Sequence, residues 1–242
     1  MSRYKERVYR KKINGCDLVS FHVMVKQTDL WVSADINLED YTRDLVFDCR
    51  HEIETYITSH PEFATSLLPL PKDPFAPPLI KEMIKSSGEF GIGPMASVAG
   101  AIAQYVADGL SKLTDQVIVE NGGDVFLYGN RPMTVAIFAG NSPLSERFGL
   151  LIPEKMMPVG VCSSSATVGH SLSMGVADVV CLLSYSGALA DSAATALCNR
   201  IKKKKDLERV ADWAGKSGGI LGGIAIVDDR MATWGEIELL KL

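Results

Sequence analysis

The spacing of apolar residues along the chain predicts three main helices. Across residues 38–57, apolar side chains recur every three or four positions with charged residues between them, and the pattern stops near His60-Pro61. This spacing places the apolar side chains on one face of a long helix. Residues 96–113, rich in alanine, and residues 189–201 predict two further helices. The small side chains of the first would let it lie close to a sheet or another helix.

Shorter segments with alternating or continuously apolar residues predict strands. Residues 7–13 and 18–26 flank Asn14-Gly15, a favoured hairpin turn, and residues 30–34 add a third strand. Later strands are predicted at residues 116–120, 125–128, 133–139, 149–152, 159–162 and 179–183, and a closing hairpin at residues 220–228 and 231–240. Short helices are predicted at residues 79–87 and 206–214, and an irregular, proline-rich connection at residues 67–78.

The order of these elements predicts the fold class. Strands, a long helix, further helices, many strands, a helix and final strands do not form the strict alternation of a doubly wound parallel fold. We therefore expect an α+β fold with mostly antiparallel sheet packed with helices, as one domain spanning residues 1–242. Each half roughly repeats strands, helix and strands, which suggests an internal duplication.

Composition narrows the function without naming it. The chain has 242 residues, is 47% hydrophobic and carries a formal net charge of −4, which argues against a dedicated nucleic-acid binder. Five scattered cysteines without a Cys-x-x-Cys pair argue against a disulfide framework or a zinc ribbon. The basic run Lys202–Lys205 follows a helix and fits a solvated helix end better than RNA binding.

No segment of the sequence indicates export or membrane insertion. The N-terminus lacks an apolar signal core, and the most apolar later stretch, residues 176–190, contains Asp178 and is too short to span a bilayer. The expected location is therefore the cytoplasm.

Asn121-Gly122-Gly123-Asp124 is the strongest local signal for a ligand site. Adjacent glycines can adopt positive φ and let the backbone approach a ligand, and successive amides can cradle phosphate oxygens. Asn121 offers a donor and an acceptor, and Asp124 could hold a hydroxyl or a metal-bound water. The alternative is a plain hairpin turn, because Asn-Gly is common there.

Asp191 and Thr195 lie four residues apart on a predicted helix, so they share one face. A carboxylate and a hydroxyl suit magnesium, which keeps waters and recruits substrate phosphates for its remaining positions. The alternative is that Asp191 simply caps a helix or favours its positive end.

A third group of polar residues follows the strand predicted at residues 159–162. The hydroxyls of Ser163, Ser164, Ser165 and Thr167 could form the wall of a site for a sugar, a phosphate or a ring edge. His170 could act as a general base, since its ordinary pKa lies near neutrality. A lone loop histidine is also consistent with simple solvation.

Three stretches together resemble the ApbE family of flavin-transferring proteins, and more closely its uncharacterised ApbE-like relatives. Residues 99–108 (Ala-Gly-Ala-Ile-Ala-Gln-Tyr-Val-Ala-Asp) resemble the family's helix before its Gly-Gly-Asp strand. Residues 121–124 resemble the Gly-Gly-Asp loop. Residues 190–197 (Ala-Asp-Ser-Ala-Ala-Thr-Ala-Leu) match the helix that carries the family's magnesium ligands. The match covers roughly residues 93–200.

The resemblance implies a tunnelling-fold-like α+β structure that binds FAD and Mg²⁺. In that family the metal helps cleave the pyrophosphate, giving AMP and a flavin mononucleotide linked to a protein threonine, or free products. Asp191 and Thr195 would be the metal ligands, and Gly122, Gly123 and Asp124 would form part of the flavin-nucleotide pocket. The partner would then be a flavin nucleotide or another phosphate-bearing molecule, and self-association stays open.

Two features depart from the family's pattern. The family has a lysine where this chain has Ala99, and its His-Ile-x-Asp-Pro-x-Thr-Gly segment is reduced here to Gly169-His170-Ser171. Three functions therefore remain open: a flavin transferase or FAD pyrophosphatase, a non-catalytic ligand-binding or accessory protein in cofactor or sulfur metabolism, and a self-associating domain with no small-molecule role.

Overall fold

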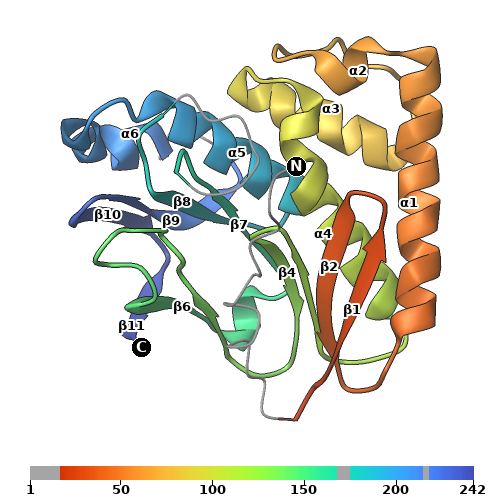
Figure 1. The fold of residues 1–242 in the computed structure, drawn as a ribbon, viewed down its shortest axis with the longest axis horizontal. Coiled ribbons are helices and arrows are strands. Elements are labelled where there is room, and N and C mark those ends of the chain that lie inside the picture. Colours follow the sequence, from red (N-terminus) through yellow and green to blue (C-terminus); the bar gives the residue numbers. More distant parts are fainter. Residues whose placement is uncertain (1–16, 168–174, 215–217) are drawn as a thin grey trace.

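A large antiparallel sheet forms the centre of the protein (Figure 1). The computed structural model describes residues 17–167, 175–214 and 218–242. The eight strands lie side by side in the order β1-β2-β3-β4-β7-β8-β9-β10, and every pair is antiparallel. Their bounds are β1 Val19–Val25, β2 Thr28–Ala34, β3 Val117–Asn121, β4 Asp124–Tyr128, β7 Val159–Ser164, β8 Val179–Ser184, β9 Ile220–Val227 and β10 Arg230–Gly235. The predicted α+β fold with mostly antiparallel sheet is confirmed.

Helices cover one face of this sheet, and a smaller sheet covers the other (Figure 1). The helices that pack there are α1 Glu39–Ser59, α3 Pro78–Phe90, α4 Val98–Leu110 and α5 Gly187–Arg200. The smaller sheet has the order β11-β6-β5, with bounds β5 Met133–Ala136, β6 Phe148–Ile152 and β11 Glu238–Lys241. Successive strand residues face opposite sides of the sheet. Val117 and Val119 therefore belong to the core between the large sheet and the helices, and Ile118 belongs to the core between the two sheets.

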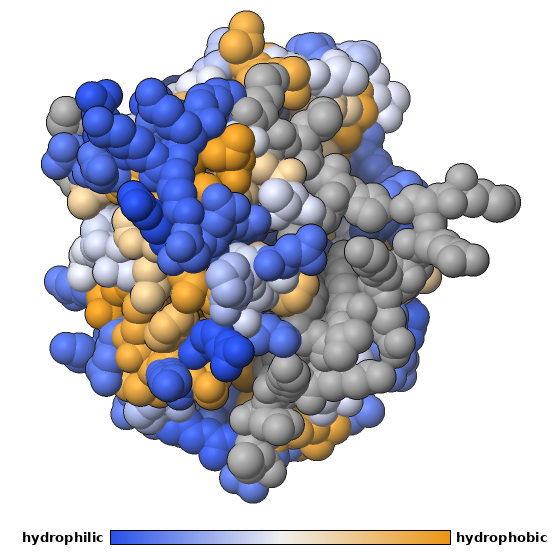
Figure 2. Space-filling view, turned by 60° about the vertical axis from the view of Figure 1, so that its left-hand side comes forward, coloured by the Kyte–Doolittle hydropathy of each residue, from blue (hydrophilic) through white to orange (hydrophobic). Residues whose placement is uncertain are grey.

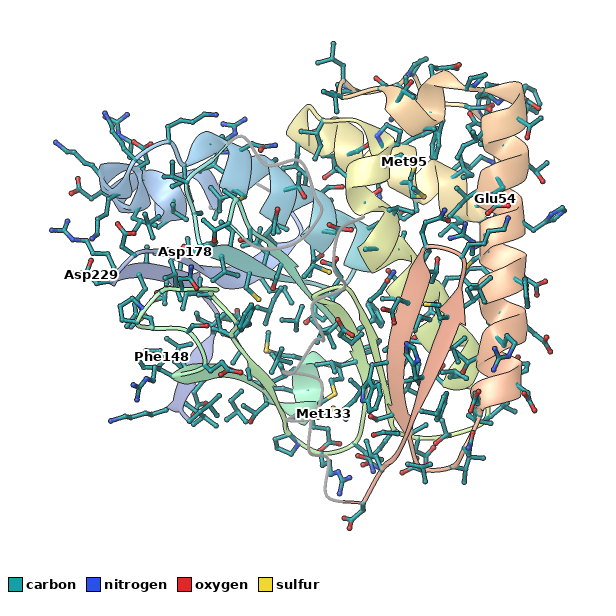
Figure 3. All side chains as sticks on the ribbon, in the orientation of Figure 1. Glu54, Met95, Met133, Phe148, Asp178 and Asp229 are labelled. Atoms are coloured by element: carbon teal, nitrogen blue, oxygen red, sulfur yellow. The ribbon has the colours of Figure 1, made fainter. Side chains whose placement is uncertain are left out.

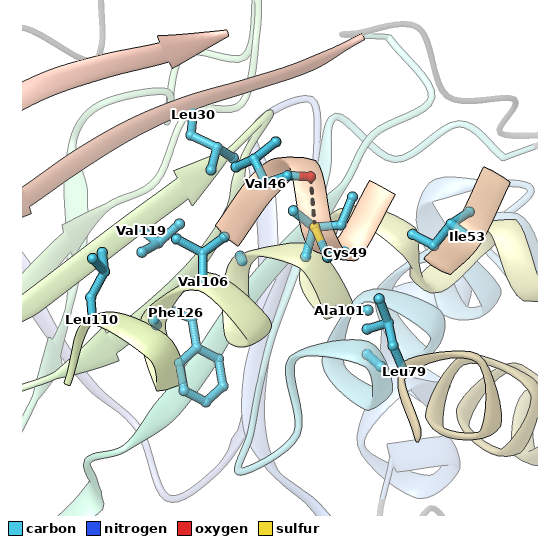
Figure 4. Close-up of a cluster of buried hydrophobic side chains, with 14 of the residues drawn as sticks. Leu30, Val46, Cys49, Ile53, Leu79, Ala101, Val106, Leu110, Val119 and Phe126 are labelled. Atoms are coloured by element: carbon cyan, nitrogen blue, oxygen red, sulfur yellow. Dashed lines mark hydrogen bonds between the residues drawn. The ribbon is translucent and has the colours of Figure 1, made fainter. Parts of the chain in front are cut away.

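The helical core explains the predicted amphipathic pattern of α1. Val46, Cys49 and Ile53 are buried on one face of the helix, three and four residues apart, and pack with Val106 of α4 and Leu30 of β2 (Figure 4). The Cys49 thiol also donates to the Val46 carbonyl.

Short helical turns complete the structure. They are α2 Glu62–Thr65, η2 Pro94–Ser97, η3 Glu154–Met156, η4 Lys204–Arg209 and α6 Val210–Ala214. The helix predicted at residues 96–113 therefore begins as the 3₁₀ turn η2 and ends earlier, at Leu110. The helix predicted at residues 206–214 is a 3₁₀ turn followed by α6.

The structure bears on two predicted hairpins. Residues 7–13 of the first lie outside the described residues, and its second segment forms β1, which pairs with β2 through a turn at Lys26, whose φ is +53°. The predicted closing hairpin is confirmed between β9 and β10, but its second strand is shorter than the predicted residues 231–240. It breaks at Gly235, whose φ of +73° turns the chain from β10 in the large sheet to β11 in the small one. A Cβ at this glycine would lie 2.3 Å from the Leu221 carbonyl oxygen, so the tight crossing requires glycine.

Within the described ranges, no single helix is long and apolar enough to cross a membrane. The pair formed by α3 and the stretch from Pro94 to Leu110 passes that test on length and composition only, and it is bent by 103°. Both members of the pair place many of their residues in the protein core.

Candidate functional site

The two segments singled out from the sequence meet at the start of α4. The Asp191 carboxylate of α5 accepts a hydrogen bond from the Gly100 backbone N–H at 2.9 Å. On the other side, the Asn121 side-chain amide at the end of β3 donates to the Ala99 carbonyl at 3.1 Å. The first turn of α4 therefore joins the Asp191 helix to the glycine hairpin, although some 70 residues separate them in sequence.

Glycine allows the two helices to approach this closely. A Cβ on Gly100 would lie 2.3 Å from the Gly187 carbonyl oxygen, and one on Gly187 would lie 2.5 Å from the Gly100 oxygen. No real side chain fits at such distances, so backbone packs on backbone here. The Gly187 N–H donates to the Gln104 side chain at 2.8 Å, one turn farther along α4, which fixes the crossing. The predicted close packing of the alanine-rich helix is confirmed.

Asp191 caps α4 and not its own helix. The N-terminus of α5 is capped by Ser186, whose hydroxyl accepts from the Leu189 N–H at 3.2 Å. The N-terminus of α4 has no side-chain cap of its own, and its Gly100 amide is satisfied by the Asp191 carboxylate. Asp191 therefore does act as a helix cap, but it caps the neighbouring helix α4.

Asn121-Gly122-Gly123-Asp124 forms a two-residue hairpin between β3 and β4. Asn121 pairs with Asp124, and the two glycines have φ values of +70° and +109°, both left-handed. The Gly123 N–H donates to the Glu120 side chain at 2.8 Å. The hairpin alternative therefore holds, and one of the two glycine amides is engaged within the protein.

Two buried carboxyl groups dominate the electrostatics of this region. Asp124 and Asp191 are only 5% and 7% exposed. Burial raises the pKa of Asp191 to about 7, against the opposing effect of the Gly100 amide. Burial first, and then the charge of Asp191, raise the pKa of Asp124 well above its usual range, while the Ser163 amide, 3.1 Å away, opposes this. Ionising both groups together is therefore costly.

Cys162 lies between the two carboxyl groups. Its thiol is 3.5 Å from the Gly187 carbonyl oxygen and hydrogen-bonds with Asp124. Burial and the two neighbouring carboxyl groups raise the pKa of this thiol, so it is an uncharged donor and not a thiolate. In the sequence, Cys162 directly precedes the hydroxyl run Ser163–Ser165, and this neighbourhood is a signal by which it could be found. Gln104 and Glu120 gave no comparable signal, because their roles depend on contacts made by the folded chain.

The chemistry of these donors fits a hard divalent cation. Among residues 17–167, 175–214 and 218–242, no three His, Cys, Asp or Glu side chains gather in a way that could hold a metal by themselves. Magnesium, however, commonly uses one or two carboxylates and takes its other oxygens from water and phosphate. No Lys or Arg of the described chain forms an ion pair with Asp124 or Asp191, so a cation would relieve their repulsion. Thr195 is half-buried one turn after Asp191 on α5.

The hydroxyl groups after β7 do not form one continuous wall. Ser163 hydrogen-bonds with Cys181, which belongs to the core between the two sheets. Ser164 is the next residue of the strand, so its buried side chain lies on the opposite face. Ser165 and Thr167 form a turn in which the Thr167 hydroxyl donates to Asp178 at 3.2 Å. His170 lies outside the described residues.

Asp178 anchors this turn to the far hairpin of the large sheet. Besides Thr167, it accepts the Asp228 N–H at 2.6 Å. Asp178 and Asp229 lie near each other at the same end of the molecule (Figure 3). The sequence-predicted hydroxyl residues therefore divide into Ser163 and Ser164, on opposite faces of β7, and the turn of Ser165 and Thr167, which Asp178 holds.

Two cavities of the described chain lie away from the hairpin. An open depression of about 470 Å³ is lined by residues including Asp35, Lys112 and Asp115, at the C-terminal end of α4. A second hollow of about 300 Å³ lies between the end of α5 and α6, next to Trp213. Neither cavity has Asp124 or Asp191 in its lining.

Comparisons with known proteins agree on the family. A family model described as "AbpE bacteria" matches residues 10–229. The "UPF0280 protein" of Methanoculleus marisnigri is 42% identical over 223 residues, covering 91% of this chain and 90% of that protein. The "UPF0280 protein" of Methanospirillum hungatei is 39% identical, covering 89% and 87%.

Solved structures of flavin transferases have a similar fold. The flavin transferase ApbE from Vibrio cholerae matches with a TM-score of 0.58 at 14% identity, covering 90% of this chain and 96% of that one. The apo flavinyl transferase ApbE from Pseudomonas stutzeri matches with a TM-score of 0.57 at 13% identity, covering 90% and 94%. At such identities the likeness concerns the fold alone.

Proposed function

This chain belongs to the ApbE family, and on that premise we propose that it is an enzyme acting on flavin nucleotides. The reaction we propose is magnesium-dependent cleavage of FAD, with the flavin mononucleotide passing to a protein threonine or to water. The observation that carries the proposal is the buried pair Asp124 and Asp191, placed between the glycine hairpin and the first turn of α4. Buried, strongly perturbed carboxyl groups concentrate at functional sites.

We assign roles to the residues of the chain as follows. Asp191 and Thr195 would hold the metal ion, whose chemistry is to neutralise charge on the pyrophosphate. Asn121, Gly122, Gly123 and Asp124 would line the nucleotide pocket, with the small glycines leaving room for the ligand. Ser163, Ser164, Ser165 and Thr167 would contact its polar groups. His170 would be the general base.

The wider expectations remain part of this proposal. Each half of the large sheet contains two strands, one or more helices and two further strands, which supports a tunnelling-fold-like duplication. We propose that residues 1–242 form one domain that works in the cytoplasm. We also propose that it binds a flavin nucleotide and no nucleic acid.

Turnover of FAD tests the proposal directly. The purified full chain is incubated with FAD and MgCl₂, and AMP and FMN are measured by liquid chromatography and mass spectrometry. We expect AMP to form only when Mg²⁺ is present, and Asp191→Asn to abolish its formation. Asp44→Asn, which removes an exposed carboxylate from α1, is the matched control and should keep full turnover. FAD binding without any AMP would reject catalysis.

A second candidate is a non-catalytic ligand-binding protein of the same fold. Its support is that the Gly123 amide is already engaged by Glu120, and that Ala99 stands where the family has a lysine. Such a protein would bind its ligand without cleaving it. Mass spectrometry of small molecules released from the purified protein separates the two candidates: intact flavin or an unrelated ligand, together with no AMP formation, favours this second function.

A further inference from the structure

A second polar and aromatic hollow lies at the opposite end of α5 from Asp191. It has a volume of about 300 Å³ and is formed where α5, η4 and α6 meet, lined by Leu197, Arg200, Ile201, Asp206, Arg209, Val210 and Trp213. Arg200 is nine residues after Asp191, which corresponds to roughly 13 Å along the helix. This hollow shares no lining residue with the candidate flavin site.

The floor of the hollow is apolar and fixed. Leu197, Ile201 and Val210 are each 1–2% exposed and belong to the core that α5 and α6 share with the sheet. The Trp213 ring packs against Phe90 with ring centroids 5.7 Å apart, so its indole is held in place from below. A rigid aliphatic floor beside an aromatic ring suits a flat apolar body.

Positive charge surrounds this floor. The Arg200 guanidinium lies 5.4 Å from the centroid of the Trp213 ring, in a cation–π arrangement. Arg209 is exposed and forms no ion pair with any residue that the structure describes. The one lining carboxylate, Asp206, accepts the N–H groups of Lys202 and Lys203 at 2.9 and 3.1 Å. Arg200 and Arg209 are therefore the positively charged groups of the lining.

The charge of this segment contrasts with that of the whole chain. Between positions 200 and 209 there are six basic residues and two acidic ones, Asp206 and Glu208, whereas the net charge of the protein is −4. Lys204 is neutralised by Asp228 and Asp229. Figure 2 turns this end of the molecule toward the viewer and shows hydrophilic side chains densely gathered on its upper part.

We propose that this hollow, termed the Trp213 pocket, binds a small aromatic anion. The ring of the ligand would lie on Leu197, Ile201 and Trp213, and its carboxylate, sulfonate or phosphate would be held by Arg200 and Arg209. The volume is at the lower end of the range for ligand cavities and accommodates one ring system, which favours a small molecule over an extended peptide. The proposal is independent of flavin chemistry.

The test uses two probes that differ only in charge, 1-naphthoate and its neutral amide 1-naphthamide. Binding to the full-length protein is followed through the indole N–H signal of Trp213 in nitrogen-15-labelled protein, identified by its loss in Trp213→Leu. We expect 1-naphthoate to shift this signal and to bind about tenfold more tightly than 1-naphthamide. The signals of Trp31 and Trp234 should not move.

Charge-matched variants decide whether the arginines bind the anion. Arg209→Gln should weaken 1-naphthoate about tenfold and leave 1-naphthamide unchanged. Lys205→Gln, which removes the same charge from an exposed neighbour outside the lining, should change neither. Asp191→Asn should also leave 1-naphthoate binding intact, which keeps this result separate from the flavin proposal.

Three results would overturn the assignment. Equal affinity for the two probes would show that the pocket does not require an anion. Equal effects of Arg209→Gln and Lys205→Gln would show that the net charge of this surface, and not a contact with Arg209, attracts the anion. Tighter, Arg209-dependent binding of an acidic peptide containing phenylalanine than of 1-naphthoate would identify the surface as a protein-docking site instead.

Discussion

Replacing Asp191 by asparagine should make the protein more stable at neutral pH. The pKa of Asp191 lies at about 7, against an ordinary value of 3.8, because the group is buried. Between about pH 4 and about pH 7 the unfolded chain therefore loses this proton while the folded chain keeps it, so stability falls as pH rises through that window. A pKa difference of this size lowers the free energy of unfolding by about 4 kcal/mol above about pH 7. Asparagine can still accept the Gly100 N–H but carries no charge.

The assay is urea unfolding of wild type and Asp191→Asn from about pH 4 to about pH 8 in the presence of EDTA. The two free energies of unfolding should be similar at the acidic end, and the variant should become more stable by up to about 4 kcal/mol at the alkaline end. Adding Mg²⁺ at the alkaline end should then stabilise the wild type selectively. Asp44→Asn, an exposed control, should stay within about 0.5 kcal/mol of wild type throughout. A variant that is less stable than wild type by a constant amount at every pH would refute the reasoning.

Three further substitutions test packing at the site and elsewhere in the fold. Gly100→Ala places a methyl group 2.3 Å from the Gly187 carbonyl oxygen and should cost about 1–3 kcal/mol in urea unfolding. Tyr128→Phe removes the hydroxyl that donates to Asp108; it should cost about 1 kcal/mol, measured by calorimetric Tm, because the burial-raised pKa of Asp108 already indicates a poorly solvated carboxyl group. Gly235→Ala opposes a φ of +73° and a 2.3 Å contact, so hydrogen exchange should show β11 released before the large sheet.

Local sequence patterns predicted most of the fold. The apolar spacing over α1 reflects one helix face packed on one core, whereas the continuously apolar segments of β3, β4, β7 and β8 reflect strands buried on both faces. These predictions held within a few residues. The break at Gly235 was not predictable in the same way. Residues on both sides of it have strand-forming character, and only the assignment of β10 and β11 to different sheets requires a turn there.

The candidate site was predictable in its residues but not in its contacts. Asn121, Asp124 and Asp191 were identified from motifs, and the structure brings them together through Ala99 and Gly100. No pattern in the sequence indicates that Asp191 caps a different helix. The strand was predicted to end at residue 162, whereas β7 continues to Ser164, and this extension places Ser163 and Ser164 on opposite faces because successive strand residues alternate.

The cap alone does not account for an aspartate at position 191. A helix N-terminus is satisfied as well by asparagine or serine, either of which would accept the Gly100 amide without bringing a buried charge. Here the carboxyl group lies beside a second one, Asp124, and both have raised pKa values because burial disfavours their charged forms. Such an arrangement lowers stability at neutral pH, and a carboxylate adds something that an amide cannot, a negative oxygen able to bind a cation. Asp191→Asn should therefore gain stability in EDTA and lose its response to Mg²⁺ for the same reason, because it lacks the negative charge of the buried carboxylate.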